Sequence, residues 1–92
     1  MSRYLIELPH ADDYEACVKA LQALERTGSH FVTNAEWGCG DGVHVGFLIA
    51  EVEERGQALQ IVPLEFRQDA RVTRLDRYTR EQIAGMVAEP RA

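Results

Sequence analysis

The stretch Trp37-Gly38-Cys39-Gly40-Asp41-Gly42-Val43-His44 predicts the tip of a β-hairpin, and the rest of the fold can be built outward from it. An Asp-Gly step between strand-like runs favours a two-residue type I′ turn, because that turn requires a positive φ at both central residues. With Asp41 and Gly42 in the turn, Cys39 pairs with His44 and their Cβ atoms lie roughly 5 Å apart. The hairpin is therefore expected to hold a thiol beside an imidazole.

Four segments alternate apolar and polar residues as strands do, and they cover residues 3–9, 31–38, 43–53 and 70–78. In the predicted hairpin Trp37 lies opposite Gly46, where the indole ring can cover a backbone that has no side chain. We therefore assign the face of Trp37 and Leu48 to the helix side of the sheet. The other face carries an apolar row of Val43, Val45, Phe47 and Ile49.

Three segments have helical signals. Apolar residues at helical spacing follow Asp12 and Asp13, either of which can cap the helix, and Gly28 is a natural end to it. A second helix is expected over residues 54–62, where Pro63 stops it. Thr79 and Gln82 have the spacing of a capping box and predict a short C-terminal helix. Residues 89–92 are expected to fray.

The order β-α-β-β-α-β with a C-terminal helix predicts an α+β, ferredoxin-like fold for a single domain over residues 1–92. In this arrangement a four-stranded antiparallel sheet has the strand order 4-1-3-2, and both crossover helices lie on one face. The row of Val43 to Ile49 on the other face is too apolar to be left in water. We therefore expect a homodimer that packs sheet face against sheet face.

Composition and charge narrow the class of protein. The chain has 15 acidic against 10 basic residues and a net charge of −5, so it lacks the basic surface of a nucleic-acid binder. No signal peptide is apparent and no apolar run approaches the roughly 20 residues of a membrane span. We expect a cytoplasmic protein without a membrane partner, in which the two cysteines, Cys17 and Cys39, remain thiols.

The pattern resembles the dimeric α+β barrel superfamily of small ferredoxin-like proteins over about residues 3 to 78. The segments that carry the resemblance, which is to uncharacterised bacterial members, are Glu36-Trp37-Gly38-Cys39, Gly42-Val43-His44-Val45-Gly46 and Arg77-Tyr78-Thr79-Arg80-Glu81-Gln82-Ile83. The superfamily includes muconolactone-isomerase-like enzymes, cofactor-free monooxygenases and small nickel-binding proteins. The resemblance implies a homodimer, and it implies no particular activity.

In this topology the end of the first strand lies at the same sheet edge as the hairpin tip. His10 is therefore expected near Cys39 and His44, and these three residues are the predicted ligands of a transition metal such as nickel, zinc or copper. Cys17 could also approach, but it lies on the apolar stripe of its helix, and we interpret it as a core residue.

Three alternatives remain open from the sequence. A pocket between helices and sheet, with Tyr14 and Trp37 as ligand-binding residues, would suit a cofactor-independent isomerase or monooxygenase in which a histidine acts as base. A Cys39-His44 pair could also be the start of a cysteine nucleophile. The third alternative is a non-catalytic interaction module. His30 is given no role.

Overall fold

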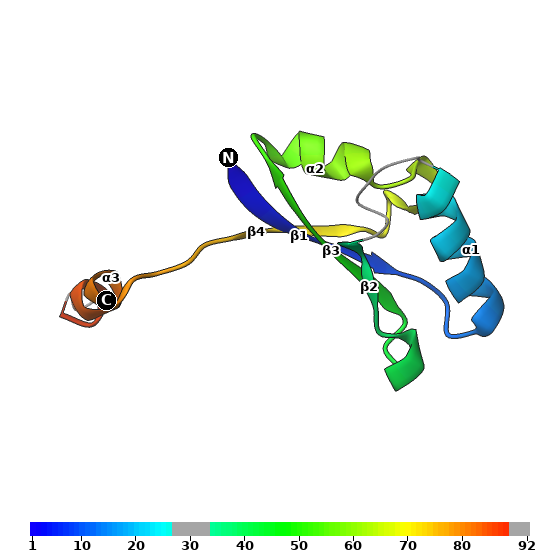
Figure 1. Ribbon diagram of the computed structural model, residues 1–92, viewed down its shortest axis with the longest axis horizontal. Coiled ribbons are helices and arrows are strands. Elements are labelled where there is room, and N and C mark those ends of the chain that lie inside the picture. Colours follow the sequence, from blue (N-terminus) through cyan, green and yellow to red (C-terminus); the bar gives the residue numbers. More distant parts are fainter. Residues whose placement is uncertain (27–33, 89–92) are drawn as a thin grey trace.

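A computed structural model of the chain describes residues 1–26 and 34–88 (Figure 1). The strands are β1 (Ser2–Pro9), β2 (Glu36–Trp37), β3 (Val45–Val52) and β4 (Arg71–Leu75). The helices are α1 (Tyr14–Arg26), α2 (Arg55–Ile61) and α3 (Arg80–Ala88). Short 3₁₀ turns cover Cys39–Asp41 and Leu64–Phe66. The predicted helix end at Gly28, the first residues of the predicted strand 31–38, His30 and the fraying at 89–92 lie outside the described residues.

All four strands form one antiparallel sheet in the order β2-β3-β1-β4, which reads β4-β1-β3-β2 from the other edge. The fold is thus α+β, as expected. The fourth strand is shorter than the predicted 70–78, because Leu75 pairs with Arg3 and β1 begins one residue earlier, at Ser2. Beyond Leu75 little of β1 is therefore left for the chain to pair with.

The core lies on one face of the sheet, under α2. Tyr4, Ile6 and Leu8 alternate along β1, and together with Leu48 they are at most 6% exposed. The remaining members of this buried cluster come from β3 and from α2 and its end, and they are Ala50, Ala58 and Val62. Among the side chains that the structure describes, the cluster includes none from α1, which lies beside the end of β1 (Figure 1).

The predicted pairing of Trp37 with Gly46 is confirmed. The indole ring lies directly over the glycine, since a Cβ at residue 46 would be 2.6 Å from a ring carbon of Trp37. Trp37 also packs against the buried cluster, together with Val72 and Phe66. The face assignment made from the sequence therefore holds along the hairpin.

Gly46→Ala is expected to destabilise the protein by about 1–3 kcal/mol, because the new methyl group must displace the indole ring. Gly56→Ala in α2 is the matched control, since a Cβ at residue 56 meets nothing within 4 Å. That substitution is expected to be neutral or to stabilise the helix by roughly 0.4–1 kcal/mol. Urea unfolding measures both changes, and equal effects of the two substitutions would contradict the packing argument.

Local capping interactions explain where the helices begin. The Asp13 carboxylate accepts the backbone N–H of Ala16 at 2.7 Å, so Asp13 is the cap of α1. At α3 the backbone N–H of Thr79 donates to Gln82 Oε1 at 2.7 Å, and that of Gln82 donates to Thr79 Oγ1 at 3.1 Å. This is the predicted capping box. Glu54 and Gln57 form a second one at α2, which the sequence reasoning did not identify.

The C-terminal helix stands apart from the sheet. Figure 1 shows α3 at the far end of an extended segment that continues from β4. None of its residues is buried. The Cα radius of gyration is 16.2 Å, against roughly 12 Å for a compact chain of this length. Packing within the described chain therefore does not account for the position of α3.

Candidate metal site

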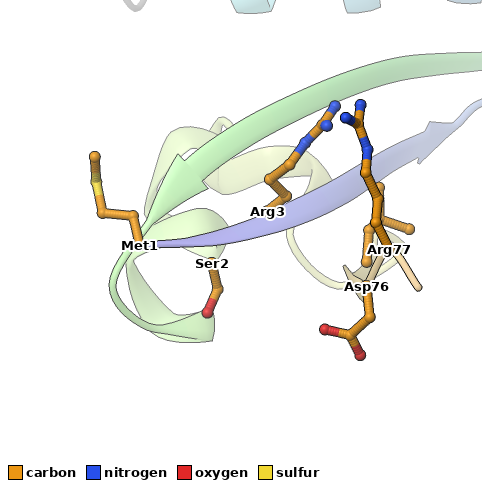
Figure 2. A pocket seen from close by; sticks show the side chains of 6 residues that line it. Met1, Ser2, Arg3, Asp76 and Arg77 are labelled. Carbon is orange, nitrogen blue, oxygen red and sulfur yellow. The ribbon is translucent and has the colours of Figure 1, made fainter. Parts of the chain in front are cut away.

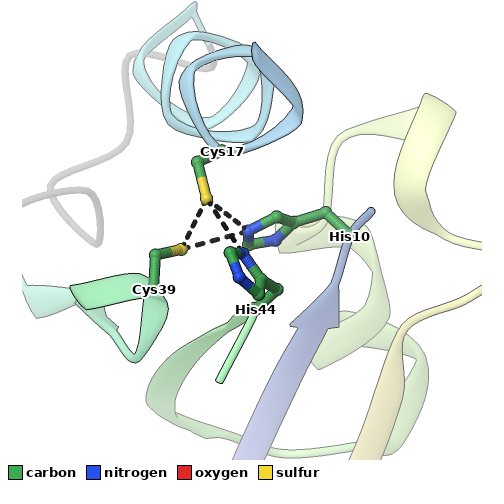
Figure 3. Close-up of side chains that lie close together, drawn as sticks. All are labelled: His10, Cys17, Cys39 and His44. Carbon is green, nitrogen blue, oxygen red and sulfur yellow. Dashed lines mark hydrogen bonds between the residues drawn. The ribbon is translucent and has the colours of Figure 1, made fainter. Parts of the chain in front are cut away.

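Two histidines and two cysteines meet at the sheet edge next to α1. His10 directly follows β1, Cys17 lies in the first half of α1, and Cys39 and His44 come from the loop between β2 and β3 (Figure 3). One donor atom from each residue lies within 4.8 Å of the other three. Three segments that are distant in sequence thus converge on one point, and the predicted trio of His10, Cys39 and His44 is brought together.

The hairpin loop that presents two of these residues differs from the predicted turn. Asp41 does not have a positive φ, and only Gly42 is left-handed, at φ 79°. The residues from Cys39 to Asp41 form a 3₁₀ turn, and the Gly38 carbonyl accepts N–H groups from both Asp41 and Val43. The type I′ prediction was wrong because a longer loop needs only one left-handed residue, and glycine supplies it without strain.

The distances between donor atoms suit one small ion. Cys17 Sγ lies 2.7 Å from Cys39 Sγ and 3.4 Å from His44 Nδ1. His10 Nε2 lies 3.0 Å from Cys17 Sγ and 3.1 Å from Cys39 Sγ. Metal–sulfur bonds of about 2.3 Å and metal–nitrogen bonds of about 2.0–2.1 Å would place the donors of a tetrahedral ion roughly 3.3–3.8 Å apart. The largest change among these distances is the separation of the two sulfurs by about 1 Å, and the contacts of His10 Nε2 with them would lengthen by roughly 0.5 Å.

Each histidine has its second ring nitrogen directed at an oxygen outside the cluster. His10 Nδ1 lies 3.3 Å from the Leu8 carbonyl oxygen, and His44 Nε2 lies 2.6 Å from the Asp12 carboxylate. When these outer nitrogens donate their protons, the inner nitrogen of each ring presents a lone pair to the sulfurs. Metal-bound histidines in proteins are oriented by such outer acceptors. The backbone also ties the segments together, since the His10 N–H donates to the His44 carbonyl at 3.0 Å.

Cys17 is at the centre of the cluster, whereas its position on the apolar stripe of the helix predicts a core residue. Its side chain is buried, and its thiol donates to Cys39 Sγ. That hydrogen bond raises the pKa of Cys17 from 9.0 to about 11, and burial and the negative charges of Cys39, Asp13 and Asp12 add to the effect. The one available signal in the sequence was the position of Cys17 one turn into the helix that follows His10.

The raised pKa of Cys17 predicts a pH dependence for the metal-free protein. The folded state holds the Cys17 proton more tightly than the unfolded state, so this contribution to stability is complete below pH 9 and is lost as the pH rises towards 11. Urea unfolding with a chelator present, over that pH range, should therefore show a falling midpoint. Cys17→Ser should flatten this part of the profile, and an unchanged slope in that variant would assign the loss to other groups.

The two residues predicted to bind an organic ligand are placed separately. Tyr14 is 84% exposed at the beginning of α1, whereas Trp37 covers Gly46 and its ring centroid lies 5.9 Å from that of His10. Between the helices and the sheet, Tyr4, Ile6 and Leu48 are packed together in the core. The indole ring therefore serves as a wall beside His10.

No match to this chain is found among protein-family models, curated proteins or solved structures. None of the helices among the described residues is both long and apolar enough to cross a membrane. What the protein does must therefore be argued from the cluster itself.

Proposed function

We propose that this chain binds one transition-metal ion through His10, Cys17, Cys39 and His44. The observation that carries the proposal is the convergence of four soft or borderline donors within 4.8 Å, with both imidazoles held from behind by oxygen acceptors. Side chains that cluster by chance would not be expected to have both imidazoles oriented by such acceptors.

Zinc is the ion that this donor set favours. Two thiolates and two imidazoles at tetrahedral spacing are typical of structural zinc sites, and thiolates disfavour hard ions such as Mg²⁺. Nickel and copper are the alternatives that the same ligands admit. Because all four positions would be filled by protein, no open position would remain for a substrate. The proposed role is therefore metal binding that holds α1 and the hairpin loop to the sheet edge, without catalysis at the metal.

The direct test is the metal content of the protein purified without chelator. Elemental analysis for zinc, nickel and copper is expected to give about one ion per chain, or to reach it after titration of the metal-free protein. Cys39→Ser and His44→Ala should each reduce the content at equal protein concentration. A wild-type protein that is folded and takes up none of the three metals would contradict the proposal.

The Asp12 carboxylate allows a sharper test, because it orients a ligand without being one. Asp12→Asn removes the charge that His44 Nε2 faces at 2.6 Å, and metal affinity is expected to fall about 10- to 100-fold. Asp41→Asn is the matched control, since Asp41 lies in the hairpin loop and is not among the clustered ligands. Competition against a chromophoric chelator measures both. Equal losses in the two variants would indicate a general charge effect.

We also propose that a second copy of the chain covers the sheet face opposite α2, here called the outer face, which carries Leu5, Phe47, Ile49 and Thr73. Ile49 is 44% exposed there. The helix α3 is a second unpaired apolar surface, with Met86 48% and Val87 81% exposed. A nine-residue helix is marginal in water by itself, so α3 also needs a partner. A dimer would cover both surfaces, as in the dimeric α+β barrel superfamily, to which we assign the chain as part of this proposal.

Charges on the outer face fit a two-fold axis through its central row. Ile49, Leu5 and Thr73 lie side by side across the strands, with Arg3 in the row on one side of them and Glu7 in the row on the other. A two-fold rotation about this row places Arg3 of one copy over Glu7 of the other. Arg3 needs such a partner, because its Nε is buried without a hydrogen bond in the described chain.

Two arginines and one aspartate lie at the end of the outer face near the N-terminus. An open pocket of about 520 Å³ lies there, at the other end of β1 from the metal cluster. Figure 2 shows the guanidinium groups of Arg3 and Arg77 side by side at this pocket. Two like charges at close range favour an acidic neighbour. Glutamates of a second copy would provide it.

A further inference from the structure

The two sulfur atoms of the cluster are themselves a reactive pair. Cys17 and Cys39 are free thiols whose sulfurs lie 2.7 Å apart. They need to approach by roughly 0.7 Å to reach the length of a disulfide bond. We propose that the pair is a peroxide-reactive dithiol, and that its oxidation to an intramolecular disulfide releases the metal ion. The second half of this inference rests on the proposed metal binding, and the first half does not.

The surroundings assign different roles to the two cysteines. Cys39 is half-buried between Gly38, which packs against Val43, and Gly40; a Cβ at Gly40 would meet nothing within 4 Å, so the loop is open on that side of the thiol. Cys17 is buried on α1. A small hydroperoxide can therefore reach Cys39 first, and Cys17 is positioned to act as the resolving thiol.

A base lies in contact with both thiols. His10 Nε2 is 3.1 Å from Cys39 Sγ and 3.0 Å from Cys17 Sγ. It can take the proton of the attacking thiol and return it to the oxygen that leaves. This matters because the thiolate is the nucleophile in both steps.

The reaction balances with a hydroperoxide as the only oxidant. Cys39 Sγ attacks the peroxide, the O–O bond breaks, and Cys39 sulfenic acid and an alcohol or water form. Cys17 Sγ then attacks Cys39 Sγ, the S–O bond breaks, and water leaves with the proton of Cys17. Two thiols are oxidised to one disulfide, and one peroxide is reduced. In the metal-bound form, the disulfide would remove two of four ligands, so the ion should dissociate.

The first arm of the test uses metal-free protein treated with hydrogen peroxide. Thiols are blocked under denaturing conditions and the chain is weighed by mass spectrometry. The expected product is a monomeric chain lighter by two hydrogen atoms, with no thiol left to block, and a reductant reverses it. A chain whose cysteines gain oxygen atoms instead of forming the bridge, or that links only to a second chain, would overturn the inference.

The second arm uses zinc-loaded protein and a chromophoric zinc indicator. Peroxide is expected to release about one zinc per disulfide formed. If the protein binds no zinc but forms the disulfide in the first arm, the proposed metal function is contradicted and the inference of a peroxide-reactive dithiol is supported. A protein that binds zinc and keeps it while the disulfide forms would contradict the coupling of the two.

Three variants separate the roles of the residues. Cys17→Ser should leave a sulfenic acid on Cys39 that dimedone traps, whereas Cys39→Ser should react on the order of tenfold more slowly, because only the buried thiol remains. Asp41→Asn is the control, since Asp41 lies in the hairpin loop outside the cluster and its replacement leaves both thiols and both histidines in place. It should still form the disulfide. Equal reactivity of the two serine variants would overturn the assigned order of attack.

Discussion

Zinc is expected to raise the thermal unfolding midpoint of the metal-free protein by roughly 15–30 °C when it is present at about 1,000 times its dissociation constant. Binding to the folded state alone contributes about 4 kcal/mol under that condition. For a domain of this size each kcal/mol shifts the midpoint by roughly 4–8 °C. The ion would connect α1, whose buried residues Cys17, Ala20 and Ala23 lie outside the core cluster of the sheet and α2, to the sheet edge.

The control for this shift is the same titration on Cys39→Ser, which keeps the helices and the sheet but loses one thiolate. Its midpoint should move far less, and Mg²⁺ should move neither protein, because a hard cation prefers oxygen ligands. Hydrogen exchange adds a local readout, since the amides of α1 should gain protection when zinc binds. If zinc binds but the midpoint moves by only a few degrees, the ion does not connect α1 to the sheet in the way proposed.

The parts of the fold that could be predicted from the sequence are those fixed by neighbouring residues. The pairing of Trp37 with Gly46 follows because the indole ring covers a backbone that has no side chain. The capping box of Thr79 and Gln82 follows from spacing, which for the first helix left Asp12 and Asp13 as alternative caps. The helix α2 ends just before Pro63, because proline has no backbone N–H to donate to the helix. Each of these signals acts over a few residues, so one sequence is enough to find it.

Other features depend on contacts that the linear pattern does not contain. In the hairpin loop, Gly42 has a left-handed conformation and Asp41 does not, so residues 39–41 form a 3₁₀ turn instead of the predicted two-residue turn. His44 nevertheless lies in the cluster. Cys17 has the burial of a core residue and also the position of a ligand. A buried thiol on an apolar stripe looks the same in sequence whether it packs or binds. Only the contacts of His10 and Cys39 with the Cys17 sulfur distinguish a ligand from a packed core residue.

Ile49→Lys is expected to raise the dissociation constant of the proposed dimer by roughly 30- to 1,000-fold. A central apolar residue of an interface contributes about 2–4 kcal/mol, and a lysine there would also bury an unpaired charge. Ile49 lies beside Leu5 in the central row of the outer face, where the two-fold axis would bring the copies closest. Because the side chain is 44% exposed in one chain, the substitution should cost the fold itself much less.

Leu59→Lys is the matched control, because Leu59 is 36% exposed on α2, which covers the other face of the sheet. Sedimentation or light scattering over a concentration series should show wild type and Leu59→Lys as dimers and Ile49→Lys as a monomer. Wild type that remains a monomer at tens of micromolar would contradict the proposed dimer.

A second variant that lacks residues 80–92 separates the contribution of α3 from that of the outer face. If α3 packs across the partner, its removal weakens the dimer while the metal content of the monomer stays the same.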